Sequence, residues 1–183
     1  LGCNGLTVVI SIKDLANPGE PTFPRLTMDI AAPELLTKNS TVTLEKFGGR
    51  ISMYSLERIA GEKLRAYLMS LPTYVQKHDR PRDAVRVKDL FDIARILRAR
   101  PLPQNVEFWT VAASEFEICC QARYVDCNGL DSFRENLDQA QFQYQNERVI
   151  PSDQIGFTEA WQATVTIIKY FQTVLEFPLI NDI

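Results

Sequence analysis

The chain has 183 residues, 45% of them hydrophobic and 10% aromatic, enough for a substantial core in one domain or two small ones. No run approaches the roughly 18 consecutive apolar residues that a membrane span requires. The net charge of −3 is unevenly distributed: residues 77–100 carry 8 basic and 4 acidic side chains, whereas residues 101–183 carry 4 basic and 12 acidic ones. The basic segment suits either contact with phosphates or a solvated loop, and the acidic remainder argues against broad wrapping of a nucleic acid.

The cysteines do not form a recognisable disulfide framework or zinc motif. The 4 cysteines include no Cys-x-x-Cys pair, and His78 is the only histidine. We therefore expect a reduced, cytoplasmic protein.

The first part of the chain reads as strands and turns. Residues 6–12 and 26–31 are rich in β-branched and apolar side chains, and a turn-rich connection separates them. Two runs typical of strands, residues 41–47 and 50–54, flank the pair Gly48 and Gly49, which predicts a hairpin. Ser55 follows as a predicted helix N-cap, with Glu57 in the first turn.

The rest of the chain reads as helical, with prolines between the segments. The expected helices cover residues 56–70, 87–98, 106–124, 131–147 and 158–175, with a Pro/Arg-rich loop after the first. We therefore predict an α+β fold, with a β-rich part over residues 1–54 and a helical domain over residues 55–183.

The first predicted helix contains a charge on its apolar stripe. At helical spacing, Lys63 lies in the same arc as Ile59 and Tyr67. An unpaired ammonium group among apolar neighbours is costly, so Lys63 needs a partner or a ligand. The opposite side of this helix, expected to face solvent, carries Arg58, Glu62 and Arg65.

The next predicted helix carries an acid in a matching position. Asp89 projects between Ile93 and Ile96, inside an otherwise apolar sector. One interpretation is a structural ion pair between Lys63 and Asp89; the other is a site where a ligand shares these charges, and lysine suits a phosphate. The polar gap of this helix is expected to hold Lys88, Asp92 and Arg95.

Asp29 is the third unusual position. Alternation in residues 26–31 places Asp29 on the same strand face as Thr27 and Ala31, and aspartate is depleted in strands. That face either meets solvent or holds a carboxylate on a rigid strand to bind a divalent cation.

Three motifs in order resemble the AbiEii/AbiGii toxin family of nucleotidyltransferases. They are S-L-E-R-I-A-G-E-K-L-R-A-Y-L from Ser55, R-V-K-D-L-F-D-I from Arg86, and I-P-S-D-Q-I-G-F-T-E-A-W from Ile150 with a later E-F-P-L. The resemblance spans roughly Asp29 to Pro178. In this chain Gly61 replaces the alanine that usually precedes the Glu-Lys pair.

The resemblance implies a polymerase β-like core with a helical C-terminal region, and Mg²⁺-dependent transfer of a nucleotide from an NTP to an RNA or protein acceptor. Many members are toxins paired with an antitoxin. By motif, Lys63 would contact the triphosphate, and Asp89, the second catalytic residue, would support either that lysine or the attacking hydroxyl. Arg86 and Lys88 would be the flanking basic positions that bind the NTP, and Asp29 would be a metal ligand. We expect Asp29, Lys63 and Asp89 to converge on one cleft.

The family's glycine turn, helix and Asp-x-Asp strand are not found before Asp29. We expect either that this N-terminal part was removed from the chain or that the chain is a degenerate member, and that the polypeptide alone is inactive. The alternatives are a non-catalytic helical module that binds a protein or RNA, in which Lys63 and Asp89 form only a structural pair, and an unrelated helical domain.

Overall fold

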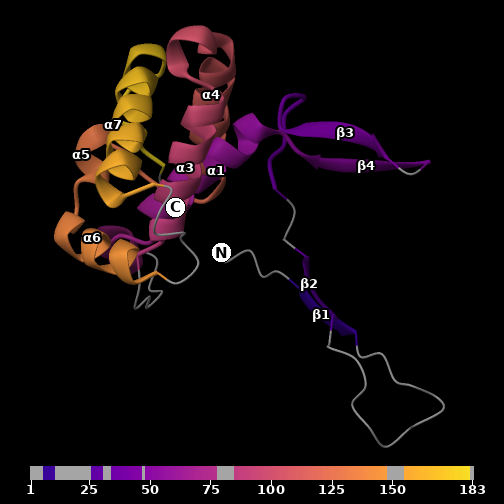
Figure 1. The fold of residues 1–183 in the computed structure, drawn as a ribbon, viewed down its shortest axis with the longest axis horizontal. Coiled ribbons are helices and arrows are strands. Elements are labelled where there is room, and N and C mark those ends of the chain that lie inside the picture. Colours follow the sequence, from indigo (N-terminus) through magenta and orange to yellow (C-terminus); the bar gives the residue numbers. More distant parts are fainter. Residues whose placement is uncertain are drawn as a thin grey trace, which may run out of the picture. The chain divides into compact units, whose positions relative to one another are not determined.

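The computed structural model describes residues 6–10, 26–30, 34–46, 48–77, 85–147 and 155–181. The chain divides into two compact units, Leu1–Leu35 and Leu36–Ile183. Strands occupy the first part of the sequence and helices the rest (Figure 1). This architecture confirms the predicted α+β class.

The first unit contains one antiparallel strand pair. Strand β1, Leu6–Ile10, pairs with β2, Leu26–Ile30, and Thr7 lies opposite Asp29. Both strands were expected from the sequence. The direction of the Asp29 side chain, and with it the expected convergence of Asp29 with Lys63 and Asp89, lies outside what the structure describes.

The second unit begins with the predicted hairpin. Strand β3, Thr41–Lys46, pairs with β4, Gly49–Tyr54, and Gly48 has a φ of 75°, a backbone conformation that glycine adopts without strain. Ser55 then caps the first helix by accepting a hydrogen bond from the Arg58 backbone N–H, as predicted. The register places four exposed apolar side chains on one face of the hairpin: Val42, Leu44, Ile51 and Met53.

Helices build the remainder of this unit. They are α1 Leu56–Leu68, α2 Pro72–Lys77, α3 Val87–Ala99, the short 3₁₀ helix η1 Leu102–Gln104, α4 Val106–Ala122, α5 Leu130–Phe133, α6 Leu137–Asn146 and α7 Phe157–Val174. Four of them, α1, α3, α4 and α7, lie where the sequence predicts helices. Among the described residues, no helix is both long enough and apolar enough to cross a lipid bilayer.

Two segments differ from the prediction. Helix α2 lies in the expected loop, where Pro72 opens the helix and the Thr73 backbone N–H donates to Glu135 at 3.0 Å. The single helix expected over residues 131–147 is divided into α5 and α6. The division falls at Asn136, whose φ of 60° lies in the left-handed region that asparagine tolerates. The hydrogen bond between Thr73 and Glu135 thus connects helix α2 to the segment between α5 and α6.

Helix α1 packs against both α3 and α4, while α7 packs against α3 and α4 in turn. Aromatic rings fill the space between them: Tyr67 of α1 stacks on Phe133 with ring centroids 6.1 Å apart, and Phe116 of α4 lies 5.7 Å from Phe171. Because α1 is covered on more than one side, the expectation that Arg58 and Arg65 face solvent is wrong, and both are buried.

The contact between α1 and α4 is closest at Gly61. A Cβ atom at this position would lie 2.6 Å from the Phe116 backbone nitrogen and 2.9 Å from the Glu115 carbonyl carbon. Only glycine allows the two backbones to approach this closely. The replacement of alanine by glycine in the motif therefore has a packing cause in this chain.

Candidate functional site

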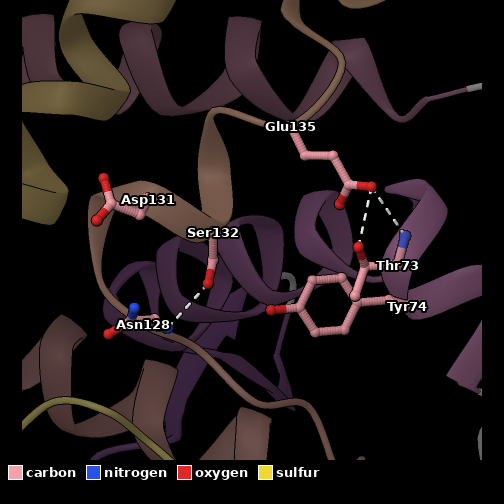
Figure 2. Close-up of a pocket in the computed structure, with 6 residues that line it drawn as sticks. All are labelled: Thr73, Tyr74, Asn128, Asp131, Ser132 and Glu135. Carbon is pink, nitrogen blue, oxygen red and sulfur yellow. Dashed lines mark hydrogen bonds between the residues drawn. The ribbon is translucent and has the colours of Figure 1, made fainter.

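A polar pocket of about 440 Å³ lies beside the start of α2 (Figure 2). Its polar groups largely satisfy one another: Glu135 accepts from the Thr73 backbone N–H and hydroxyl, both at 3.0 Å, and Ser132 Oγ accepts from the Asn128 backbone N–H at 2.8 Å. None of the candidate residues from the sequence lines this pocket. Its lining is Thr73, Tyr74, Asn128, Asp131, Ser132 and Glu135.

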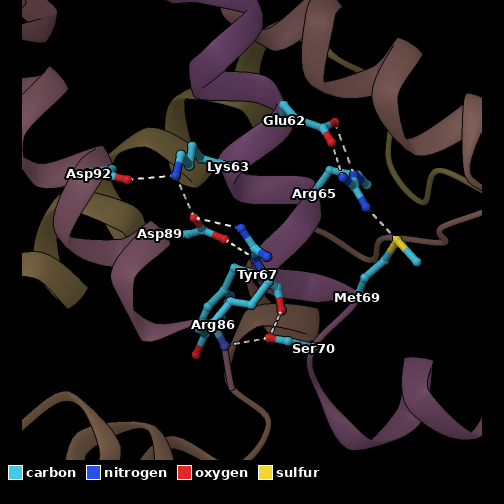
Figure 3. Close-up of polar contacts among 9 residues, drawn as sticks. All are labelled: Glu62, Lys63, Arg65, Tyr67, Met69, Ser70, Arg86, Asp89 and Asp92. Atoms are coloured by element: carbon cyan, nitrogen blue, oxygen red, sulfur yellow. Dashed lines mark hydrogen bonds and ion pairs between the residues drawn. The ribbon is translucent and has the colours of Figure 1, made fainter. Parts of the chain in front are cut away.

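The candidate site lies instead between α1 and α3, where Lys63 meets Asp89 (Figure 3). The distance from Lys63 Nζ to Asp89 Oδ1 is 2.9 Å. The Lys63 side chain is 29% exposed, whereas that of Asp89 is only 1% exposed. The contact expected from the two sequence anomalies is confirmed, and it places an ammonium group at the edge of the core rather than inside it.

Asp89 is held by a second cation. Arg86 Nε lies 2.5 Å from Asp89 Oδ2, and Arg86 Nη2 lies 3.4 Å from Asp89 Oδ1. Arg86 is fixed in turn through its backbone N–H, which donates to Ser70 Oγ at 3.0 Å. Asp89 also belongs to the first turn of α3, where the helix dipole favours a carboxylate. The buried acid is therefore anchored at both oxygens.

The Lys63 ammonium group has another carboxylate partner that the sequence analysis missed. Lys63 Nζ lies 2.7 Å from Asp92 Oδ2, and the Asp92 side chain is 35% exposed. The sequence analysis placed Asp92 in the polar gap of α3. Its spacing of three residues from Asp89 was the available signal, because residues at i and i+3 are neighbours on a helix surface.

The charges in this group compensate one another. Burial alone would lower the pKa of Lys63, but its hydrogen bonds to Asp92 and Asp89 outweigh that effect and raise the pKa above the ordinary 10.5. Lys63 is therefore charged at neutral pH. The two cations Lys63 and Arg86 face the two carboxylates Asp89 and Asp92, and we call these four residues the α1–α3 charge cluster.

Of the other two basic candidates, Arg86 belongs to the cluster through Asp89 but is also open to solvent. Arg86 is 47% exposed, so part of its guanidinium group faces solvent. Lys88 is exposed on α3, and no ion pair joins it to the cluster in the described part of the chain.

The cluster does not fit a divalent metal ion. Both of its carboxylates already face cations, whereas Mg²⁺ and Ca²⁺ need oxygen ligands free to bind them. Within residues 34–46, 48–77, 85–147 and 155–181, no group of three or more His, Cys, Asp and Glu side chains is placed to hold a metal ion. The side chain of Asp29, the predicted metal ligand, lies outside the described part.

A second ion pair, also missed by the sequence analysis, is buried more deeply. Arg58 Nη1 lies 3.2 Å from Glu115 Oε2, and each side chain is only 2% exposed. Glu115 also accepts from Ser40 Oγ at 2.8 Å and from Thr37 Oγ1 at 2.6 Å. This network joins α1, α4 and the segment that precedes β3, which indicates a structural role.

The described cysteines are not candidates for catalysis. Cys119, Cys120 and Cys127 are free and buried. Burial raises the pKa of each thiol, to about 12 for Cys127, so these groups stay protonated at neutral pH.

The model of a family described as the nucleotidyl transferase AbiEii toxin, of a type IV toxin–antitoxin system, matches residues 4–174. That range includes α1 and α3 and therefore the whole charge cluster. No curated protein and no solved structure matches the chain.

Proposed function

The chain belongs to the AbiEii family of toxin nucleotidyltransferases, and from this premise we propose that it acts in the transfer of a nucleotide from an NTP to an RNA or protein acceptor. We assign Lys63 to the triphosphate and Asp89 to the support of Lys63. The observation that supports this assignment is a charged, partly exposed ammonium group held 2.9 Å from a buried carboxylate.

Lys63 has the properties that a phosphate-binding residue needs. Its raised pKa keeps it charged, and α1 gives it a rigid attachment. A lysine ammonium group is a compact point charge that binds phosphate well. Asp89 is anchored by Arg86, so it limits the positions that the lysine can take.

The proposed reaction is a substitution at the α-phosphorus. The acceptor hydroxyl oxygen forms a bond to that phosphorus, the bond from it to the bridging oxygen of the β-phosphate breaks, and pyrophosphate leaves with that electron pair while the hydroxyl proton passes to solvent. Negative charge grows on the leaving group, and Lys63 stabilises it electrostatically. Arg86 and Lys88 are candidates for further phosphate contacts.

The Mg²⁺ ion implied by the resemblance is not assigned to the charge cluster, because its carboxylates are already compensated by cations. Asp29 remains our candidate for a ligand to that ion, and no step of the proposed mechanism depends on it. A cognate antitoxin is the protein partner that the family implies.

The test compares Lys63→Ala with the wild type, using the full-length protein as its gene encodes it. We expect the variant to lose transfer of label from radioactive NTP to total RNA in the presence of Mg²⁺, while circular dichroism shows an intact fold. Lys169→Ala removes an exposed lysine from α7 and serves as the control, with transfer unchanged.

A second candidate function rests on the same contacts. Lys63 already has two carboxylate partners, as a purely structural lysine would. The chain would then be a non-catalytic helical module for a protein or RNA partner. Transfer by Lys63→Ala at the wild-type rate would contradict the role assigned to Lys63. If the wild-type protein transfers nucleotide from none of the four NTPs, the result would favour the binding module.

A further inference from the structure

The two carboxylates that hold Lys63 are themselves held very differently. Asp89 is 1% exposed and is bound by Arg86 as well as by Lys63. Asp92 is 35% exposed, and in the described part of the chain Lys63 is its one ion-pair partner. An exposed carboxylate with one partner can rotate into water at a small cost in free energy. A buried carboxylate that leaves its partners has a much larger cost in free energy.

This difference matters because the cluster is neutral as a whole. Two cations face two carboxylates, so an incoming anion meets no excess positive charge. Two of the three Lys63 N–H donors face carboxylates, so Lys63 can offer a phosphate more than one donor only after one carboxylate has moved away. Asp92 is the one that can move, because water can solvate it and because Asp89 is anchored.

We propose that Asp92 is a positioning residue that acts as an exchangeable counter-ion: it holds the Lys63 ammonium group when no phosphate is bound and gives up that contact to an incoming phosphate. This inference rests on the proposed function, in which Lys63 binds the triphosphate. Asp89 keeps its contact throughout and fixes the direction of the lysine.

The direct test is the binding of inorganic triphosphate to the 183-residue chain by isothermal titration calorimetry at fixed ionic strength. Asp92→Asn keeps the shape of the side chain and removes its charge. We expect it to bind triphosphate about two- to fivefold more tightly than the wild type, because an exposed ion pair no longer competes with the ligand.

Asp89→Asn removes the same charge but also the carboxylate that fixes the direction of Lys63, so we expect a smaller gain in triphosphate affinity than for Asp92→Asn. The matched control is Glu159→Gln, which also removes one exposed negative charge from an ion pair, that with Arg98, away from the cluster. We expect the control to bind triphosphate within about a factor of 1.5 of the wild type, since distant exposed charges are largely screened by salt.

A measurement on the wild-type protein avoids any dependence on the stability of a variant. When triphosphate is added, the carboxyl ¹³C signal of Asp92 should shift toward that of a solvated aspartate, while that of Asp89 changes little. In nucleotide transfer by the full-length protein, Asp92→Asn should lower KM for NTP with kcat unchanged, a split that a merely structural residue would not produce.

The outcomes separate the two proposals. If wild-type binding of triphosphate is absent, or is unaffected by Lys63→Ala, the proposed role of Lys63 fails and this inference fails with it. If binding depends on Lys63 but Asp92→Asn gives no gain in affinity, or Glu159→Gln gives an equal gain, only the exchange role of Asp92 is overturned. An unmoved Asp92 carboxyl signal on a bound wild type would overturn it as well.

Discussion

Lys63 and Arg58 lie on the same helix, and the positive charge of each is compensated by carboxylates in a different way. Arg58 is only 2% exposed and pairs with the equally buried Glu115. Lys63 keeps 29% of its side chain exposed and shares two carboxylates. A buried ion pair is a weak source of stability, so the partial exposure of Lys63, rather than its pairing alone, favours a ligand-binding role.

The pH dependence of stability provides a test of the Lys63 contacts. Its pKa in the folded state is raised above the ordinary 10.5, so its contribution to the free energy of unfolding is fully present below pH 10.5 and is lost as the pH rises through the raised pKa. Lys63→Met removes this contribution at every pH. We expect the variant to be less stable by about 1–3 kcal/mol at neutral pH, because Asp89 loses a partner.

The measurement is urea denaturation of both proteins at about pH 8 and about pH 11. The difference in the free energy of unfolding should be smaller at the higher pH. Tyrosines that ionise in this range are common to both proteins and cancel in the difference. A difference that stays constant or grows with pH would mean that the charge of Lys63 does not stabilise the fold.

At the scale of elements, α1 carries a residue of each ion-pair network, Arg58 and Lys63. Sequence spacing predicted its position, its N-cap and the direction of Lys63, because these follow from the geometry of a single helix. Spacing did not predict the burial of Arg58 and Arg65. The sequence of a helix gives the direction of each side chain about the helix axis. It does not give the number of neighbouring helices that pack around that helix, because this number depends on the tertiary fold.

Gly61 links this helix to α4, and Gly61→Ala tests that contact. Alanine is favoured over glycine in a helix by about 1 kcal/mol, but overpacking costs about 1–3 kcal/mol, and here the new Cβ would lie 2.6 Å from a backbone atom. We expect a net loss of stability and a lower Tm by differential scanning calorimetry.

The control for this change is Gly156→Ala, at the start of α7, where an added Cβ meets nothing within 4 Å. Gly156 is the N-cap of α7, where alanine is less favourable than glycine, so we expect a small fall in Tm, less than that of Gly61→Ala. A higher Tm for Gly61→Ala would show that α1 and α4 can separate without loss, and that the glycine is not required by packing.

For the whole molecule, local patterns predicted the order of strands and helices, and the departures from it lie at segments that contact distant parts of the chain. The hairpin β3–β4 and four of the helices are confirmed. Helix α2 and the segment between α5 and α6 are joined by the hydrogen bond from Thr73 to Glu135, which are 62 residues apart in the chain. Asp92 was missed for a related reason: its partner Lys63 lies on another helix, and the spacing from Asp89 was the only indication within α3.

The largest such omission is the network around Glu115, which joins three separate parts of the second unit. Glu115→Gln keeps the shape of the side chain but removes the negative charge that faces the Arg58 guanidinium group, which is 2% exposed. We expect a loss of about 3–5 kcal/mol in the free energy of unfolding, measured by urea denaturation.

The network also attaches the segment before β3, because Thr37 and Ser40 donate to Glu115. Limited proteolysis of Glu115→Gln should therefore cut residues 34–40 faster than in the wild type, before the helices unfold. Replacing both charged partners, as in Arg58→Met with Glu115→Leu, should recover part of the lost stability, since no charge then remains buried without a partner. A loss under about 1 kcal/mol for Glu115→Gln would mean that water reaches Arg58 and that the network does not hold the hairpin to the helices.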